Sequence, residues 1–124
     1  MQSIEEKWYN KYVGLPYKHL GDSVDNGIDC WNLCALVLKE QCGYEVPWRT
    51  IDFCNIIEED WYTKTHERWI DNAFSKNDSF FEKLDLNTPL QLFDIITMSL
   101  GSTNVTNHCA IYVDRNKVLQ TMIK

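Results

Sequence analysis

The chain passes abruptly from a turn-forming segment into a helix-forming one at Cys30. Gly27 and Asp29 stand directly before the cysteine, and glycine and aspartate are typical of turns. Over residues 30–42 apolar side chains recur at helical spacing, and Gly43 follows as the expected stop. The sequence therefore predicts a helix over residues 30–42 that begins at Cys30.

A thiol in the first turn of a helix has favourable electrostatics. The first backbone N–H groups lack partners within the helix, and the positive end of the helix dipole lies there. Both effects favour the thiolate, so Cys30 is a candidate nucleophile. Asp29 is expected to cap the helix, and its charge opposes the thiolate. On composition alone an inert buried cysteine is the more frequent case, since free cysteines are commonly buried.

The rest of the chain predicts a single α+β domain over residues 1–124. A short helix is expected over residues 3–12. The segment from about 45 to 90 has helical periodicity and reads as a helical insertion. Short β-rich runs close the chain, at residues 94–100, 108–113 and 117–121. Helices followed by a meander predict N-terminal helices packed on a small antiparallel sheet.

The last two runs allow a geometric prediction. A three-residue turn at residues 113–115 would place His108 opposite Gln120 on one face of the hairpin. If the helix that begins at Cys30 covers this face, the small Ala110 lets it approach, and the thiol meets His108. Cys30 would then be the nucleophile, His108 the base and later the acid, and Gln120 the group that orients the imidazole. His108 could instead be a strand histidine bonded to a backbone carbonyl, and Gln120 could be a polar edge residue.

Charge and cysteine usage exclude several classes of function. The net charge of -6 argues against nucleic acid and against an anionic membrane surface as partners. No apolar run approaches the roughly 20 residues of a membrane span. The polar, acidic start of the chain is unlike a signal peptide, so we expect synthesis in the cytoplasm. Five cysteines without a CxxC pair predict reduced thiols and no metal site, with Cys34 and Cys109 as structural fillers.

A set of residues spread over most of the chain matches a known pattern in order and spacing. The set comprises Tyr17, Gly21, Gly27, Asp29-Cys30, Leu33, Phe93-Asp94-Ile95-Ile96, His108-Cys109-Ala110-Ile111-Tyr112-Val113 and Val118-Leu119-Gln120. It resembles the NlpC-type cell-wall endopeptidases, a papain-like family. The resemblance implies a papain-like core in which Cys30, His108 and Gln120 are catalytic. It also implies that Tyr17, Asp29 and Trp31 line the substrate and oxyanion site.

The activity implied by this resemblance is hydrolysis of an amide in a peptidoglycan stem peptide, commonly the bond between γ-D-glutamate and a diamino acid. No metal or organic cofactor is expected. Trp31 and Asn32 stand where the family usually has Ser and Gly, a variant similar to versions carried in phage tail proteins. The usual Gly before the strand aspartate is Phe93. We therefore expect a virion-borne or lysis-related peptidase that acts in the host cell envelope, with other tail proteins as further partners.

Two other readings stay open. Related papain-like folds act as acyltransferases or amidases on lipids and other amides, which would keep the triad and change the acceptor. In a non-enzymatic reading, the domain is a structural component of a tail, and the triad is vestigial. The sequence stops four residues after Gln120, so the sheet is expected to be short, or to be completed by a partner or by a further C-terminal portion.

Overall fold

The computed structural model describes residues 7–18, 20–46, 82–99, 108–114 and 116–121. Of the helical insertion predicted over about 45–90, residues 47–81 lie outside the described ranges, as does the first part of the helix predicted over residues 3–12. Residues 82–90 are described and contain turns rather than a helix, so the helical prediction is wrong for them. Within the described ranges, no helix is long and apolar enough to cross a membrane.

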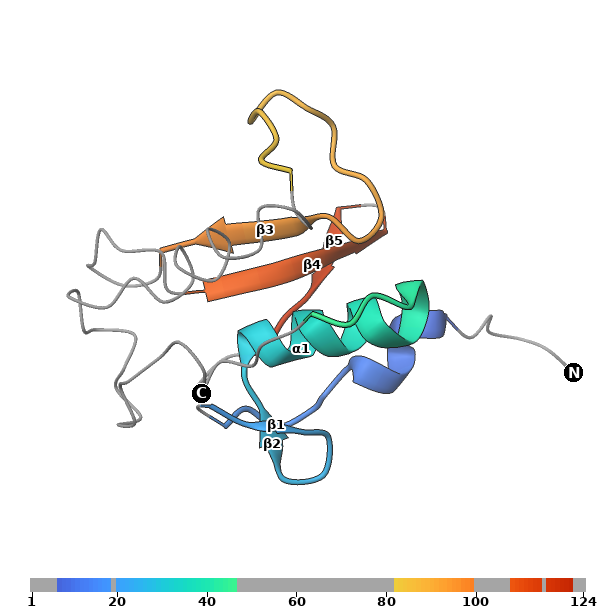
Figure 1. Cartoon of the computed structure of the whole chain (residues 1–124), viewed down its shortest axis with the longest axis vertical. Helices are drawn as coiled ribbons and strands as arrows, with labels where there is room; N and C mark the ends of the chain where they lie inside the picture. Colours follow the sequence, from blue (N-terminus) through green and yellow to red (C-terminus); the bar gives the residue numbers. More distant parts are fainter. Residues whose placement is uncertain (1–6, 19, 47–81, 100–107, 115, 122–124) are drawn as a thin grey trace, which may run out of the picture.

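One α-helix and two small antiparallel sheets make up the described part of the chain (Figure 1). A 3-10 helix, η1 (Trp8–Tyr12), precedes the hairpin of β1 (Asp22–Ser23) and β2 (Gly27–Ile28). The helix α1 (Cys30–Val37) continues into a π-helical turn, η2 (Leu38–Cys42). The second sheet contains β3 (Ile95–Met98), β4 (His108–Asp114) and β5 (Lys117–Leu119) in the order β3-β4-β5. The predicted α+β class and the antiparallel meander are confirmed.

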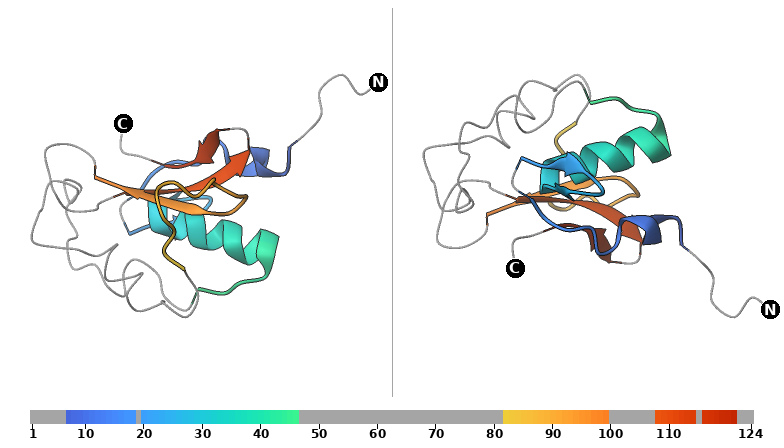
Figure 2. Two further views of the ribbon diagram at one scale, coloured as in Figure 1. Left: turned by 90° about the horizontal axis from the view of Figure 1, so that it is seen from above. Right: turned by 90° about the horizontal axis from the view of Figure 1, so that it is seen from below.

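The start of α1 lies between the two sheets. Figures 1 and 2 show the three-stranded sheet on one side of α1 and the β1–β2 hairpin on the other. Asp29 caps the helix, because its Oδ1 accepts a hydrogen bond of 2.7 Å from the backbone N–H of Asn32. Gly43 ends η2 with a φ of +75°, a conformation that glycine adopts without strain. The predicted limits of the helix are therefore confirmed, whereas its last turn is π-helical rather than α-helical.

Contacts with η2 and with Phe93 hold the N-terminal segment in place. The hydroxyl of Tyr12 donates to Glu40 Oε1 at 2.6 Å and accepts from Gln41 Nε2 at 3.2 Å. The ring of Trp8 packs against that of Phe93, with 5.3 Å between centroids. The short helix expected in this segment is present as the 3-10 turn η1.

The hairpin of β4 and β5 has a different register from the one predicted. Tyr112 pairs with Val118, Asp114 pairs with Lys117, and the register shifts between Tyr112 and Asp114. The expected three-residue turn is therefore wrong. Asn116 adopts a φ of +66°, which asparagine tolerates and which permits a tighter turn, and the bulge absorbs the additional residue. The pairing is displaced by two residues, so every side chain keeps its predicted face.

The β1–β2 hairpin was not predicted, because its residues read as a loop rich in turn formers. Ser23 Oγ accepts the backbone N–H groups of Asp25 and Asn26 at 3.2 Å each, which closes the turn. Tyr17 forms an isolated parallel bridge with Ile28 beside this hairpin. The segment before the helix is therefore an ordered part of the fold that reaches up to Cys30.

Candidate active site

The thiol of Cys30 interacts with the first residue of β4, which is His108. Cys30 is the first residue of α1, and its exposed fraction is 0%. His108 and the side chain and backbone of Cys109 act on this thiol through hydrogen bonding that lowers its pKa. The structure thus unites the predicted nucleophile with the predicted base, which lie 78 positions apart in the sequence.

The surroundings of Cys30 favour its ionised form. Burial opposes the thiolate, but the hydrogen bonds from Cys109 and His108 outweigh it and lower the pKa of Cys30 to about 5. Burial also opposes a charged imidazole, yet the bonds with Cys30 and Gln120 raise the pKa of His108 above its ordinary value. The pair therefore favours a thiolate beside an imidazolium, the reactive form of a cysteine nucleophile.

Gln120 contacts the opposite side of the imidazole. Its Oε1 lies 2.9 Å from His108 Nε2. Because an amide oxygen is an acceptor, Nε2 carries the proton in this contact, which leaves Nδ1 for the thiol of Cys30. His108 is buried, whereas Gln120 is exposed. The structure thus brings the predicted trio together, and the role of each member stays a prediction.

The helix meets β4 through a different face from the one predicted. We expected α1 to lie over the face that carries Ala110. Instead, Cys34 Sγ lies 3.9 Å from Cys109 Sγ, and both residues belong to the core with Ile111. Side chains alternate along a strand, so the body of α1 packs on the Cys109 face, while Cys30 at the start of α1 interacts with His108 at the start of β4. Apolar packing decides this orientation, since Ile111 and Ile95 are paired neighbours that both pack in the same core.

The three residues predicted to line the site lie around the start of α1. Tyr17 lies beside Ile28, two positions before Cys30: Lys18 N–H donates to the Ile28 carbonyl at 3.3 Å, and Ile28 N–H donates to the Pro16 carbonyl at 2.9 Å. Asp29 and Trp31 flank the nucleophile, and each is 1% exposed. Asp29 is the helix cap, and Trp31 packs in the hydrophobic core. Their roles toward a substrate stay predictions.

Two contributions to the site were missed in the sequence. Asn32 Nδ2 donates to the carbonyl of Gly21 at 2.9 Å, and Asp29 N–H donates to the same oxygen at 3.0 Å. These bonds attach the loop that follows Tyr17 to the first turn of the helix. Cys109, expected to be a filler, lowers the pKa of Cys30 through hydrogen bonding. The signal that was overlooked is its place, directly after the candidate base.

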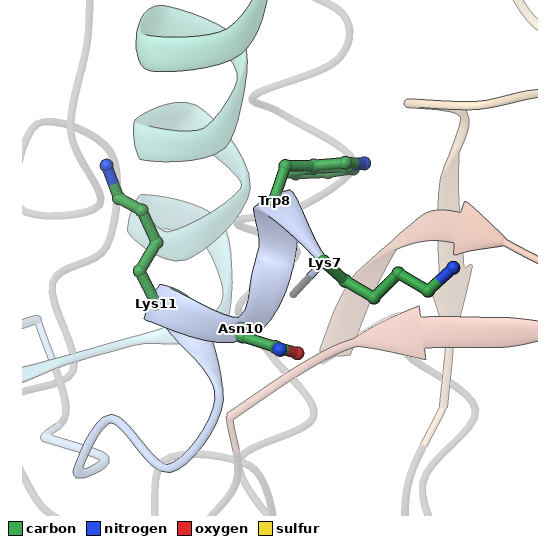
Figure 3. A pocket seen from close by; sticks show the side chains of 4 residues that line it. All are labelled: Lys7, Trp8, Asn10 and Lys11. Carbon is green, nitrogen blue, oxygen red and sulfur yellow. The ribbon is translucent and has the colours of Figure 1, made fainter. Parts of the chain in front are cut away.

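A pocket of about 440 Å³ opens far from this site (Figure 3). It is lined by Lys7, Trp8, Asn10 and Lys11 on and beside η1. Lys11 forms an ion pair of 3.0 Å with Glu40, near the end of the helix opposite to Cys30. Among the described residues, the lining of this pocket holds no cysteine, so it does not share the thiol chemistry of the Cys30 site. Among the described residues, no three His, Cys, Asp or Glu side chains are arranged to hold a metal ion.

Comparison with known proteins gives one match. The model of the NlpC/P60 family matches residues 14–124. This range includes Tyr17, Cys30, His108 and Gln120. No curated protein and no solved structure matches the chain.

Proposed function

Because the chain belongs to the NlpC/P60 family, we propose that it is a cysteine peptidase that hydrolyses an amide bond in peptidoglycan stem peptides. The family is one of cysteine peptidases and hydrolases of the cell wall. The observation that carries the proposal is the contact of the Cys30 thiol with His108, whose Nε2 lies 2.9 Å from Gln120. The helix, the antiparallel sheet and the order of these residues are compatible with a papain-like core.

The reaction proceeds in two halves. Cys30 Sγ attacks the scissile carbonyl carbon, and the C–N bond breaks as His108 gives its proton to the leaving amine. This leaves a thioester on Cys30. Water then attacks the thioester and gives a proton to His108, and the S–C bond breaks. The products are a carboxylic acid, an amine and the restored thiolate–imidazolium pair.

The start of α1 supplies the charge stabilisation for this chemistry. The backbone N–H of Cys30 is the proposed first donor to the oxyanion, because the N–H groups of Asn32 and Leu33 are bonded to Asp29. Tyr17 is the proposed second donor, since its backbone lies beside Ile28 next to the nucleophile. Gln120 holds the imidazole in the tautomer that directs Nδ1 at the sulfur.

The proposed bond joins γ-D-glutamate to a diamino acid, and the proposed setting is a phage tail or host lysis. The support for this setting is the pair Trp31 and Asn32, which replaces the Ser and Gly usual in the family. The expected result is that mass spectrometry finds the chain in purified phage particles, or in the lysate when it serves lysis.

Digestion of defined peptidoglycan peptides tests the activity. We expect new amine and carboxylate ends by mass spectrometry, and their identity gives the scissile bond. Cys30→Ala should abolish cleavage. Cys42→Ala is the matched control, because Cys42 lies at the end of η2, away from His108. Residual turnover of Cys30→Ala comparable with the unmodified chain would contradict the proposal.

Alkylation by iodoacetamide separates the other readings. Fast modification of Cys30 at neutral pH without peptide cleavage would point to an acyltransferase or amidase with another substrate. Because Cys30 is 0% exposed, the pH dependence of the rate is the readout. A rate that rises only in the pH range of an ordinary thiol would favour a structural tail component with a vestigial triad. Both outcomes would overturn the peptidase assignment.

A further inference from the structure

Three cysteine thiols lie together between α1 and β4. Cys30 and Cys34 are one helical turn apart and so lie on the same side of α1. Cys109 lies opposite them on β4, with its Sγ 3.9 Å from Cys34 Sγ. Their exposed fractions are 0% for Cys30, 1% for Cys34 and 0% for Cys109. The sulfur that would carry the negative charge is thus surrounded by protein and faces a second thiol.

A buried thiolate needs hydrogen-bond donors. Transfer of a charge out of water is costly unless partners replace the lost solvent. Among the described residues, His108 and Cys109 on β4 act on the pKa of Cys30, and Asp29 and Cys34 lie on the same segment as Cys30. Asp29 directs Oδ1 at the N–H of Asn32 and cannot donate as a carboxylate. His108 and Cys109 are the side-chain groups whose hydrogen bonding lowers the pKa of Cys30.

Cys109 is suited to donate because it stays protonated. Its hydrogen bonds with Cys30 and Cys34, together with burial, hold the pKa of Cys109 well above its ordinary value. Two adjacent thiols share one negative charge, since ionisation of the first opposes ionisation of the second. An S–H donor is weak in water, but it is strengthened in a low-dielectric interior.

We propose that Cys109 is a positioning residue for the nucleophile, whose S–H group donates to the Cys30 thiolate while the Cys34 S–H group donates to Cys109. The proposal rests on the proposed function in one respect, the assignment of Cys30 as nucleophile. The Cys109 S–H group stabilises the charged sulfur from the sheet side, and the bond from Cys34 on α1 strengthens Cys109 as a donor. The Cys109 donor also holds Sγ of Cys30 at a constant position relative to the imidazole of His108.

A matched pair of variants tests the donor. Cys109→Ser and Cys109→Ala are similar in size, and serine retains a donor that alanine lacks. The readout is the ultraviolet absorbance of the thiolate as a function of pH, with the spectrum of Cys30→Ala subtracted. No reagent has to reach the buried sulfur. We expect Cys109→Ala to raise the apparent pKa of Cys30 by about one unit, or a tenfold loss of thiolate on the acid side. Cys109→Ser should stay close to the unmodified chain.

Variants of two other cysteines, Cys34 and Cys42, serve as comparisons for the pKa shift of Cys30. Cys34→Ala removes the second donor, so we expect a smaller shift in the same direction. Cys42→Ala should leave the titration unchanged. The acid limb of kcat/KM should move with the absorbance in each variant, which a merely structural role of Cys109 would not produce.

The outcomes separate the two proposals. An ordinary thiol pKa for Cys30 in the unmodified chain would overturn the activated nucleophile and hence the proposed function. A low pKa of Cys30 that is unchanged in Cys109→Ala, or raised as far in Cys109→Ser, would overturn the donor role alone. Circular dichroism checks folding. Should the alanine variant not fold, Cys109→Val replaces it as the variant without a donor.

Discussion

Gln120 Oε1 lies 2.9 Å from His108 Nε2, although the pairing of Ile111 with Leu119 places Gln120 level with Ala110. The contact is therefore diagonal across the hairpin. Diagonal neighbours on one face lie within reach of long side chains, and glutamine is long enough to span this step. The imidazole is thereby held between an acceptor on one side and the thiol of Cys30 on the other.

We expect Gln120→Ala to lower kcat about tenfold to a hundredfold, less than the loss of the general base itself in His108→Ala. The physical reason is that Gln120 orients the ring without taking part in proton transfer. Gln120→Asn should behave like alanine, because the shorter side chain cannot span the diagonal. Steady-state cleavage of a defined peptide measures these rates, with the exposed Lys117→Ala on the same hairpin as control. A Gln120→Ala variant as slow as His108→Ala would contradict the orienting role.

The pH dependence of kcat/KM is expected to be bell-shaped. Cys30 must lose its proton, so activity rises as pH increases through its pKa of about 5. His108 must keep its proton for the leaving amine, and its pKa is raised from 6.5, so activity falls only above that pH. Gln120 raises the pKa of His108, so Gln120→Ala should move the alkaline limb to lower pH. An acid limb in the range of an ordinary thiol would contradict this account.

Asn32→Ala should loosen the loop that precedes the helix. The substitution removes the bond of 2.9 Å to the Gly21 carbonyl, and a hydrogen bond of this kind contributes about 1 kcal/mol to stability. Urea unfolding measures the loss, and KM should rise because the segment near Tyr17 is less well held. Asn26→Ala is the control, since its side chain is exposed in the turn of the β1–β2 hairpin. Equal stability of both variants would refute this role of Asn32.

Gly21→Ala should destabilise the chain more than Gly14→Ala. A Cβ at position 21 would lie 2.4 Å from the carbonyl oxygen of Gly27, and backbone would have to move. We expect a cost of about 1–3 kcal/mol, typical of overpacking. Gly14 has a φ of +84° and open space around a Cβ, so its substitution tests backbone strain alone. The comparison is made by urea unfolding, and a larger loss for Gly14→Ala would contradict the steric argument.

Phe93→Gly should have opposite effects on stability in two backgrounds. Phe93 adopts a φ of +74°, which is strained for a residue with a side chain. Its ring contact with Trp8 offsets this strain. We therefore expect Phe93→Gly to destabilise the unmodified chain and to stabilise the Trp8→Ala variant. A double-mutant cycle by urea unfolding measures the coupling, and additive effects would count against it.

Local chemistry explains what could be predicted around the nucleophile. The Asp29 cap and the Gly43 stop act within a few residues of themselves, so the limits of the helix follow from short-range rules. The β1–β2 hairpin escaped prediction because its strands are two residues each and carry no alternating pattern. The bond from Asn32 to Gly21 was equally hidden, since it joins a helix to a loop that only the folded chain brings near.

The sequence by itself determined that His108 and Gln120 share a face, because the period of two along a strand is a property of the backbone and survives a register error of two residues. Only the tertiary structure decided the register and the face that meets α1. The register depends on the turn at Asn116 and its bulge. The face depends on the apolar packing of Ile111 and Cys109 against the helix. Both the register and the face depend on free energies summed over contacts between distant segments. This packing placed Cys109 rather than Ala110 next to Cys30.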